Sequence, residues 1–162
     1  ATCLLDPRDW RARAHMTRAG ALGVLGGPLS ALARGGLART MVPMSAVANL
    51  RRMSRNRALS HLCAVDPHGG AARVPLGFLA SYLRFAHTPP ERNRTPVTLL
   101  HPGRDAWTPV ELSARVLSRA AGPAELVVLR ECGHFPVEDP GVTDLVDAVA
   151  DLARRLGSRG GD

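Results

Sequence analysis

The 162-residue sequence predicts an α/β fold built around a parallel β-sheet. Two short apolar runs, residues 96–100 (PVTLL) and 125–129 (ELVVL), have the length and aliphatic composition of buried strands. A helical pattern follows each run, so strand and helix alternate from residue 96 to residue 157. Because this alternation is typical of βαβ units, we expect the two strands to run parallel.

Capping residues mark the two helices that belong to these strands. Thr108 and Glu111 have the spacing of a capping box, and Pro109 suits the first helical position. The helix that starts there is expected to end at Gly122. The last helix is expected to begin at Asp139 and carries one apolar stripe, made of Val142, Leu145, Val146, Val149, Leu152 and Leu156.

The first 94 residues have a different pattern. Residues 1–5 (ATCLL) predict a strand, and Asp6 or Asp9 is expected to cap the helix that follows. From residue 20 on, glycine, leucine and alanine dominate and no strand pattern is visible. Short helices are expected there at about residues 29–34, 37–41, 44–60 and 76–85. This segment suits a lid over a pocket, and the alternative is that it only covers a sheet face.

These patterns divide the chain into four parts. We expect a strand and helix of the core at 1–19, a helical cap or lid at 20–94, a C-terminal core at 95–157 and a disordered tail at 158–162. The charge balance changes sign near residue 95. The boundary between cap and core is therefore placed there.

The net charge of +7 comes from arginine alone, because the sequence has no lysine. Residues 1–94 hold fourteen arginines and four acidic residues, whereas residues 95–162 hold seven arginines and ten acidic residues. One interpretation is that the N-terminal arginines lie on solvated helix faces with acidic partners elsewhere. Another is that they attract anionic substrates or a lipid surface. No nucleic-acid-binding motif accompanies the charge, so no nucleic-acid partner is expected.

Several classes of protein are not expected from this composition. No apolar run approaches the roughly 18–20 residues that span a bilayer, so stable membrane insertion is not predicted. Cys3, Cys63 and Cys132 are widely spaced and form no zinc pattern, and the histidines show no metal-ligand spacing. We therefore expect a cytoplasmic protein without a metal or other cofactor.

An acid and a histidine follow the two predicted strands. Asp105 lies in the loop after residues 96–100, and His134 lies in the loop after residues 125–129. The carboxyl ends of the strands are where an open α/β sheet places its chemistry. An acid followed by a histidine is also the order in which α/β-hydrolases supply the second and third members of a Ser–Asp–His triad.

The segments around these residues resemble the C-terminal part of the α/β-hydrolase family. PVTLLHPGRDAWTP is similar to the family's strand-plus-acid segment, and ELVVLRECGHFPVEDP is similar to its strand-plus-histidine segment. The resemblance covers residues 96–156. It implies the parallel-sheet portion of an α/β-hydrolase fold, in which residues 1–5 form the strand after the nucleophile helix. Residues 20–90 are then the inserted helical cap.

The resemblance also implies roles for individual residues. His134 would be the base that takes the proton of a serine hydroxyl, and Asp105 would fix its tautomer. Trp107 and Phe135 would line the mouth of the substrate pocket, and His101 is a further candidate for a polar pocket residue. Gly103 and Gly133 are expected to allow tight backbone turns beside the acid and the histidine, and Glu138 is expected at the surface.

One part of the family pattern is missing from the sequence. No G-x-S-x-G occurs in the 162 residues, and the oxyanion-hole segment is not recognisable either. We therefore expect a serine hydrolase that cleaves carboxylic esters, esterase-like or lysophospholipase-like, with its nucleophile encoded upstream. The expected substrate is a small ester or a lipid-like molecule, and this chain alone is expected to be inactive. The alternatives are a non-catalytic binding protein and a dehalogenase-type or epoxide-hydrolase-type member with an Asp nucleophile.

Overall fold

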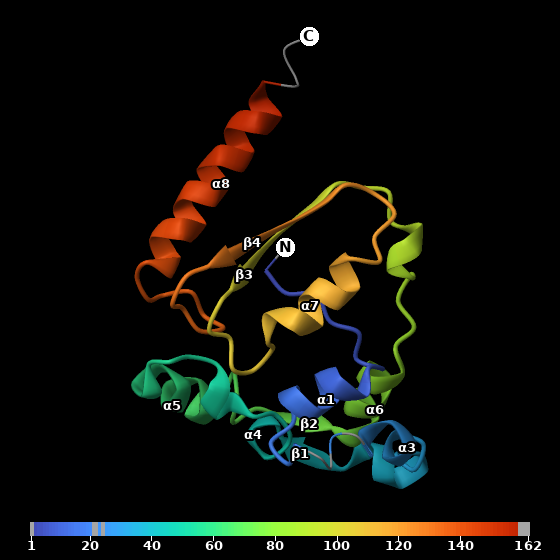
Figure 1. Cartoon of the computed structure of the whole chain (residues 1–162). Helices are drawn as coiled ribbons and strands as arrows, with labels where there is room; N and C mark the ends of the chain where they lie inside the picture. The colour runs from blue at the N-terminus through green and yellow to red at the C-terminus, as the bar shows by residue number, and fades with distance from the viewer. Residues whose placement is uncertain (1, 21–22, 24, 159–162) are drawn as a thin grey trace.

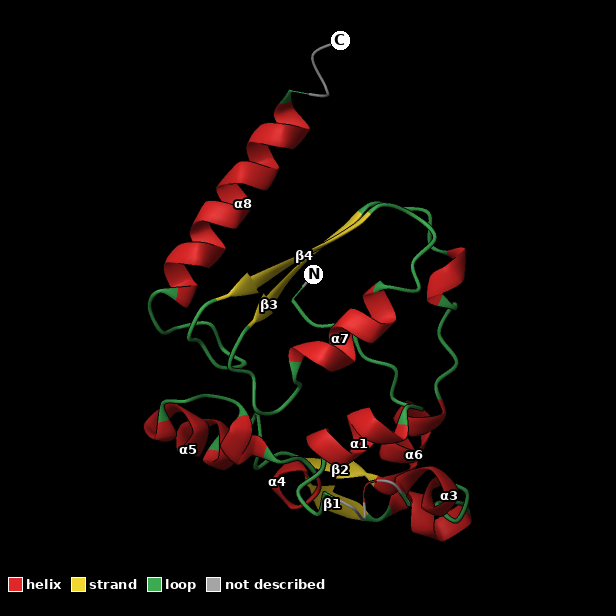
Figure 2. Cartoon of the chain, viewed as in Figure 1, coloured by secondary structure: helices red, strands yellow, loops and turns green. Residues whose placement is uncertain are grey.

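The computed structural model describes residues 2–20, 23 and 25–158, and these residues form two lobes (Figure 1). The C-terminal lobe, residues 95–158, holds a parallel pair of strands with a helix on each side. The N-terminal lobe, residues 7–94, consists mostly of short helices (Figure 2). The last residues before residue 95 contact the C-terminal lobe, since Glu91 pairs with Arg119 at 2.6 Å and the Gly122 amide donates to the Asn93 carbonyl at 2.9 Å. The boundary between cap and core near residue 95 stays a prediction.

The C-terminal lobe is the expected β-α-β-α unit. Strand β3 (Val97–Pro102) pairs in parallel with β4 (Ala124–Leu129), with Pro102 opposite Leu129 at the carboxyl ends. Helix α7 (Val110–Leu117) connects the strands and α8 (Gly141–Gly157) follows β4. The α/β class and the parallel pairing predicted from residues 96–129 are thus confirmed.

The core of this lobe lies between the strands and the helices. Leu100 and Leu129 form a buried cluster with Cys132, against which Leu145 and Ala148 of α8 pack. Leu99 is fully buried and, because side chains alternate along a strand, faces the opposite side of the sheet. The cover of the strand pair is incomplete, because Leu126 and Val128 of β4 are 38% and 47% exposed. The expectation that residues 125–129 form a buried strand is therefore wrong for most of β4, whereas four of the six residues of β3 are buried.

The N-terminal lobe is built from many short elements. They are α1 (Trp10–Met16), α3 (Gly26–Ser30), η1 (Gly35–Arg39), β1 (Met41–Pro43), α4 (Met44–Val47), η2 (Leu50–Arg52), α5 (Arg57–Val65), β2 (Arg73–Pro75), α6 (Leu76–Arg84) and η3 (Pro90–Arg92). The Asp9 side chain caps α1 by accepting from the Arg11 amide at 2.9 Å, as expected. The helix predicted at 76–85 is also confirmed as α6.

Three expectations for the N-terminal part of the chain are wrong. The helix expected at about residues 44–60 is interrupted, since α4 ends at Val47 and α5 begins only at Arg57. Residues 2–5 were expected to form a strand with residue 1, which lies outside the described residues. They pair with no strand, and the Leu4 amide instead donates to the Ser113 hydroxyl of α7 at 3.2 Å. Strands β1 and β2 were not expected, yet they pair antiparallel with Val42 opposite Val74. Each has only three residues and ends in proline, so neither shows the alternation that identifies a strand.

The lobes meet at the loop that follows β4. The Phe135 amide of this loop donates to the Met53 carbonyl at 3.1 Å.

Within the described residues, no helix is both long and apolar enough to cross a membrane. Of the tail predicted to be disordered, only Ser158 belongs to the described residues.

Candidate active site

Two loops leave the carboxyl ends of β3 and β4 and carry the predicted acid and histidine. Backbone hydrogen bonds hold these loops together, from the Gly103 amide to the Leu129 carbonyl at 2.7 Å and from the Arg104 amide to the Cys132 carbonyl at 3.0 Å. Because the strands end side by side, Asp105 and His134 are brought to the same edge of the sheet.

Asp105 and His134 form a direct hydrogen bond. The Oδ2 atom of Asp105 lies 2.7 Å from Nδ1 of His134. Since an ionised carboxylate only accepts hydrogen bonds, the proton of this contact belongs to Nδ1. The lone pair of the neutral ring is then on Nε2, which has no hydrogen-bond partner among the described residues. The ring is therefore prepared to accept a proton at Nε2.

The carboxylate of Asp105 is buried and held by several donors. Its side chain is 1% exposed, compared with 20% for His134. Its Oδ1 atom accepts from the amides of Trp107 at 2.9 Å and Thr108 at 2.8 Å. Burial raises the pKa of Asp105, but the hydrogen bonds from His134 and Thr108 outweigh burial and hold this pKa below its usual value. Asp105 is thus an anion at neutral pH.

Thr108 has a different role from the one its sequence context predicts. Helix α7 begins at Val110 with Pro109 at its N-cap, and no side chain caps it. The Thr108 hydroxyl instead donates to Oδ2 of Asp105 at 2.7 Å and lies 3.2 Å from Nδ1 of His134. The prediction of a Thr108 cap is therefore wrong, because the buried anion is the stronger acceptor.

A signal for Thr108 is present in the sequence. Asp105 accepts from the amides two and three residues later, which is the geometry of an Asp at a helix N-cap. In the stretch Asp-Ala-Trp-Thr, this geometry turns residue 108 back toward the carboxylate.

Two aromatic side chains flank the imidazole. The Trp107 ring meets the His134 ring edge to face, with centroids 4.8 Å apart, and the Phe135 ring lies 5.7 Å away at an angle of 60°. The Trp107 indole also donates to the carbonyl of Met16 at 3.0 Å, which connects the acid loop with the N-terminal lobe. These contacts fix the ring plane of His134 from two sides.

His101 lies apart from this cluster. It belongs to β3, its side chain has no exposed surface, and its Nδ1 atom contacts the carbonyl of Pro102 at 3.0 Å. A side chain without exposed surface cannot line an open pocket. The structure therefore places His101 in the packing around the sheet and not with Trp107 and Phe135.

Gly103 and Gly133 are required for space and not for an unusual backbone angle. Neither glycine has a positive φ. A Cβ at Gly103 would come within 2.9 Å of the Leu129 carbonyl oxygen, and one at Gly133 within 3.0 Å of the Arg55 amide nitrogen. Gly103 lies in a turn, as expected. At both positions glycine also lets neighbouring backbones approach closely.

Glu138 connects the histidine loop with the N-terminal lobe. One carboxylate oxygen accepts from the Gly133 amide at 3.1 Å, and the other accepts from the Ser54 hydroxyl at 3.2 Å. Arg55 adds a bond from its guanidinium to the Glu131 carbonyl at 2.6 Å. Glu138 is half-buried, so the expectation that it is a surface residue is wrong.

Comparisons with known proteins give a similarity in fold and a shorter similarity in sequence. No protein-family model matches the chain. The structure is similar to that of a monoacylglycerol lipase from Paleococcus ferrophilus, with a TM-score of 0.57 and 20% sequence identity over 77% of this chain. The chain has the fold of an α/β-hydrolase. It represents only part of that hydrolase fold, since it covers 49% of the length of the lipase.

One curated protein shares a shorter stretch of sequence. Methylphloroacetophenone synthase from Cladonia uncialis is 38% identical over an alignment of 74 positions, and this alignment covers 40% of this chain and 3% of that protein. The chain therefore spans a small fraction of this relative.

Proposed function

We propose that this chain supplies the acid–base pair of a serine hydrolase that cleaves carboxylic ester bonds. One observation carries the proposal: the 2.7 Å bond between a buried Asp105 and Nδ1 of His134, which leaves Nε2 without a partner among the described residues. The hydrolase fold supports it, because it gives these two loops neighbouring places at the ends of parallel strands.

The chemistry assigned to His134 is proton transfer at Nε2. Nε2 takes the proton of a serine hydroxyl as the hydroxyl oxygen bonds to the ester carbonyl carbon. The same nitrogen then returns that proton to the departing alkoxide, and a water molecule repeats the sequence to release the acid. Asp105 stays ionised throughout and stabilises the imidazolium through Nδ1, while Thr108 keeps Oδ2 in place.

The serine nucleophile and the oxyanion hole are assigned to a segment outside these 162 residues. No G-x-S-x-G stretch occurs in the sequence. Ser54, which donates to Glu138 of the histidine loop, is only 8% exposed and is therefore poorly placed to meet a substrate. We therefore expect a longer polypeptide with this motif upstream to be the active enzyme.

The substrate proposed for this enzyme is a small ester or a lipid-like ester, esterase-like or lysophospholipase-like in type. The similarity in fold to a protein described as a monoacylglycerol lipase supports a lipid-like ester. Residues 20–94 are proposed as the lid over it. Their contacts with the histidine loop, through Met53 and Ser54, support a position beside the reacting groups.

The experiment that tests the proposal is His134→Ala in the longer protein, with p-nitrophenyl acetate and p-nitrophenyl decanoate as substrates. We expect kcat to fall by about 10³-fold or more, because the serine loses its base. His68→Ala is the matched control, since His68 is exposed and uses only its backbone amide in a hydrogen bond, to Asp66. Unchanged turnover in His134→Ala would remove His134 from the mechanism.

A fluorophosphonate probe distinguishes the alternatives. The longer protein is expected to react at one serine, and the isolated 162-residue chain is expected not to react. Labelling of the isolated chain would place the nucleophile inside it. Halide release from haloalkanes without any labelling would favour an Asp nucleophile, and no turnover of any of these substrates would favour a binding protein.

A further inference from the structure

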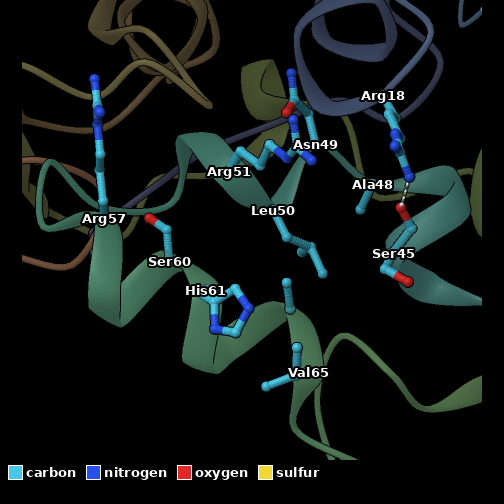
Figure 3. Close-up of a pocket in the computed structure, with 11 residues that line it drawn as sticks. Arg18, Ser45, Ala48, Asn49, Leu50, Arg51, Arg57, Ser60, His61 and Val65 are labelled. Atoms are coloured by element: carbon cyan, nitrogen blue, oxygen red, sulfur yellow. Dashed lines mark hydrogen bonds between the residues drawn. The ribbon is translucent and has the colours of Figure 1, made fainter.

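A second concave site lies in the N-terminal lobe, away from the acid–base pair. It is a cavity of about 810 Å³ bounded by α4, η2, α5 and the turn after α1 (Figure 3). This volume lies within the range of small-molecule sites. Its apolar part is formed by Leu50, Ala64 and Val65. The polar part is strongly basic, because Arg18, Arg51 and Arg57 all contribute to the lining.

No acidic residue balances these charges. The lining contains no Asp or Glu, and none of its three arginines forms an ion pair within the described part of the chain. Arg18 donates only to the Ser45 carbonyl at 3.3 Å. In Figure 3, Arg18 extends toward Ser45 and Arg51 extends toward Asn49, whereas Arg57 extends away from Leu50.

This charge pattern separates the cavity from the arginine-rich surfaces of the C-terminal lobe. There Arg104, Arg119, Arg130, Arg154 and Arg155 each have a carboxylate partner. A concave surface with uncompensated positive charge concentrates the electrostatic potential and attracts anions. Guanidinium groups also match the geometry of phosphate oxygens, which they bind in pairs.

We propose that this cavity binds a phosphate monoester attached to an apolar tail. A phosphate monoester carries a charge of about −1.5 to −2 at neutral pH, which balances two guanidinium groups better than a single carboxylate does. Arg18 and Arg51 would hold the phosphate, and Leu50, Ala64 and Val65 would contact the first carbons of the tail. This site goes beyond ester cleavage and does not require it.

The cavity is connected to the acid loop through one carbonyl group. Asn49, which lines the cavity, donates its amide to the Met16 carbonyl at 2.8 Å. The Trp107 indole donates to the same oxygen at 3.0 Å. A ligand in the cavity would therefore lie next to a segment that also positions the ring against His134.

Calorimetric titration with dodecyl phosphate, below its micelle concentration, tests the proposal without any measurement of hydrolysis. The double variant Arg18→Gln/Arg51→Gln is expected to raise Kd about tenfold or more, because each substitution removes a charged hydrogen-bond donor. The matched control is Arg52→Gln/Arg92→Gln, which removes the same charge from exposed arginines outside the lining. Its Kd is expected to change by less than about threefold, since neither Arg52 nor Arg92 belongs to the lining and could bond directly to the phosphate.

Ligand controls separate the phosphate from its tail. Dodecyltrimethylammonium has the same tail and the opposite charge, and it is expected not to bind in the cavity. Inorganic phosphate is expected to bind more weakly than dodecyl phosphate, with the same dependence on the arginines. If inorganic phosphate binds as tightly as dodecyl phosphate, the proposed contact with the apolar tail is wrong. The cavity would then be a site for inorganic phosphate.

The proposal is overturned if the two double variants weaken binding equally, if dodecyltrimethylammonium binds as tightly as dodecyl phosphate, or if neither phosphate ligand binds. Thermal unfolding of each variant shows whether it is folded. Arg51→Gln alone gives the same test with the least disturbance, because Arg51 is exposed and its side chain bonds to no described residue.

Discussion

The two lobes reach their stability in different ways. In the C-terminal lobe, strands and helices alternate around one buried cluster, and Arg115 is the only described arginine without a carboxylate partner. In the first 94 residues, elements of three to nine residues follow one another, and only Arg8 and Arg55 of fourteen arginines form ion pairs within the described residues.

The difference shows what each lobe is suited for. A rigid sheet can hold an acid and a histidine at a fixed distance, as catalysis requires. Few contacts within the N-terminal lobe hold its short elements in a single conformation. Segments of this kind, with unpaired positive charge, are suited to contact a ligand. The interpretation that the N-terminal arginines have acidic partners elsewhere in the chain therefore fails for most of them.

The largest expected effect concerns the acid of the rigid lobe. Asp105→Asn in the longer protein is expected to lower kcat on the order of 10⁴-fold, because an amide no longer stabilises the imidazolium and can favour the wrong tautomer. The measurement is ester hydrolysis under saturating substrate. Asp151→Asn, on the exposed face of α8, is the control and should retain full activity. A loss below tenfold would mean that the catalytic role of Asp105 is wrong.

Substitutions of leucine compare the packing of the two lobes. Leu129→Ala removes a side chain with no exposed surface and is expected to lower the free energy of unfolding by about 2–5 kcal/mol. Leu37→Ala in η1, where the side chain is 50% exposed, is expected to cost less than about 1 kcal/mol. Urea denaturation measures both values. Equal losses would show that the N-terminal lobe is packed as tightly as the C-terminal lobe.

Glu138 tests whether the lobes are coupled. Glu138→Ala removes the acceptor for both the Gly133 amide and the Ser54 hydroxyl, at an expected cost of about 1–3 kcal/mol. Glu138→Gln keeps one acceptor oxygen and should lose less. Hydrogen exchange at the amides of Gly133 and Phe135 should become faster in Glu138→Ala. Unchanged exchange would show that Ser54 and the histidine loop are held together without Glu138. The control is Glu111→Gln, because Glu111 is an exposed glutamate of α7.

The smallest expected effect is a dependence of stability on acid pH. Arg130 lowers the pKa of Asp144 to about 2, and hydrogen bonds lower the pKa of Asp105 despite its burial. Because both folded-state values lie below the unfolded value of about 3.9, both groups stabilise the protein above that pH. Their contributions are lost as the pH falls through the folded-state values.

The acid unfolding midpoint measures this dependence. Asp144→Asn should make stability less sensitive to pH between about 4 and 2, because the unfolded state no longer binds the extra proton there. Asp147→Asn, in the same helix, is the control, since its side chain forms no ion pair with a described residue. An identical pH dependence in wild type and Asp144→Asn would contradict the lowered pKa.

Much of the C-terminal lobe could be predicted from the sequence. The two parallel strands and the order of Asp105 and His134 are local patterns, and the structure joins them as expected. The predicted burial is found only in part, because Val128 of β4 and Val146 and Leu156 of the α8 stripe are exposed. Thr108 was misassigned because two rules compete at the same residue: its position favours a helix cap, but a buried carboxylate three residues earlier takes its hydroxyl.

The features that the sequence does not reveal depend on distant partners. Strand β1 exists only because β2, about thirty residues later, pairs with it. Glu138 is half-buried because Ser54 lies against it, across 84 positions of sequence. Residues 2–5 are apolar like a strand, but the Ser113 side chain takes the amide of Leu4. Such contacts leave no periodic pattern near the residues they involve.

The hydrogen bond from Trp107 to the Met16 carbonyl allows the contact between the lobes to be followed by tryptophan fluorescence. This oxygen uses its lone pairs for the Trp107 indole and the Asn49 amide, one donor from each lobe. The sequence has only one other tryptophan, Trp10, which is 49% exposed. In a Trp10→Phe protein, the emission wavelength of Trp107 would therefore follow the separation of the lobes, without an added fluorophore.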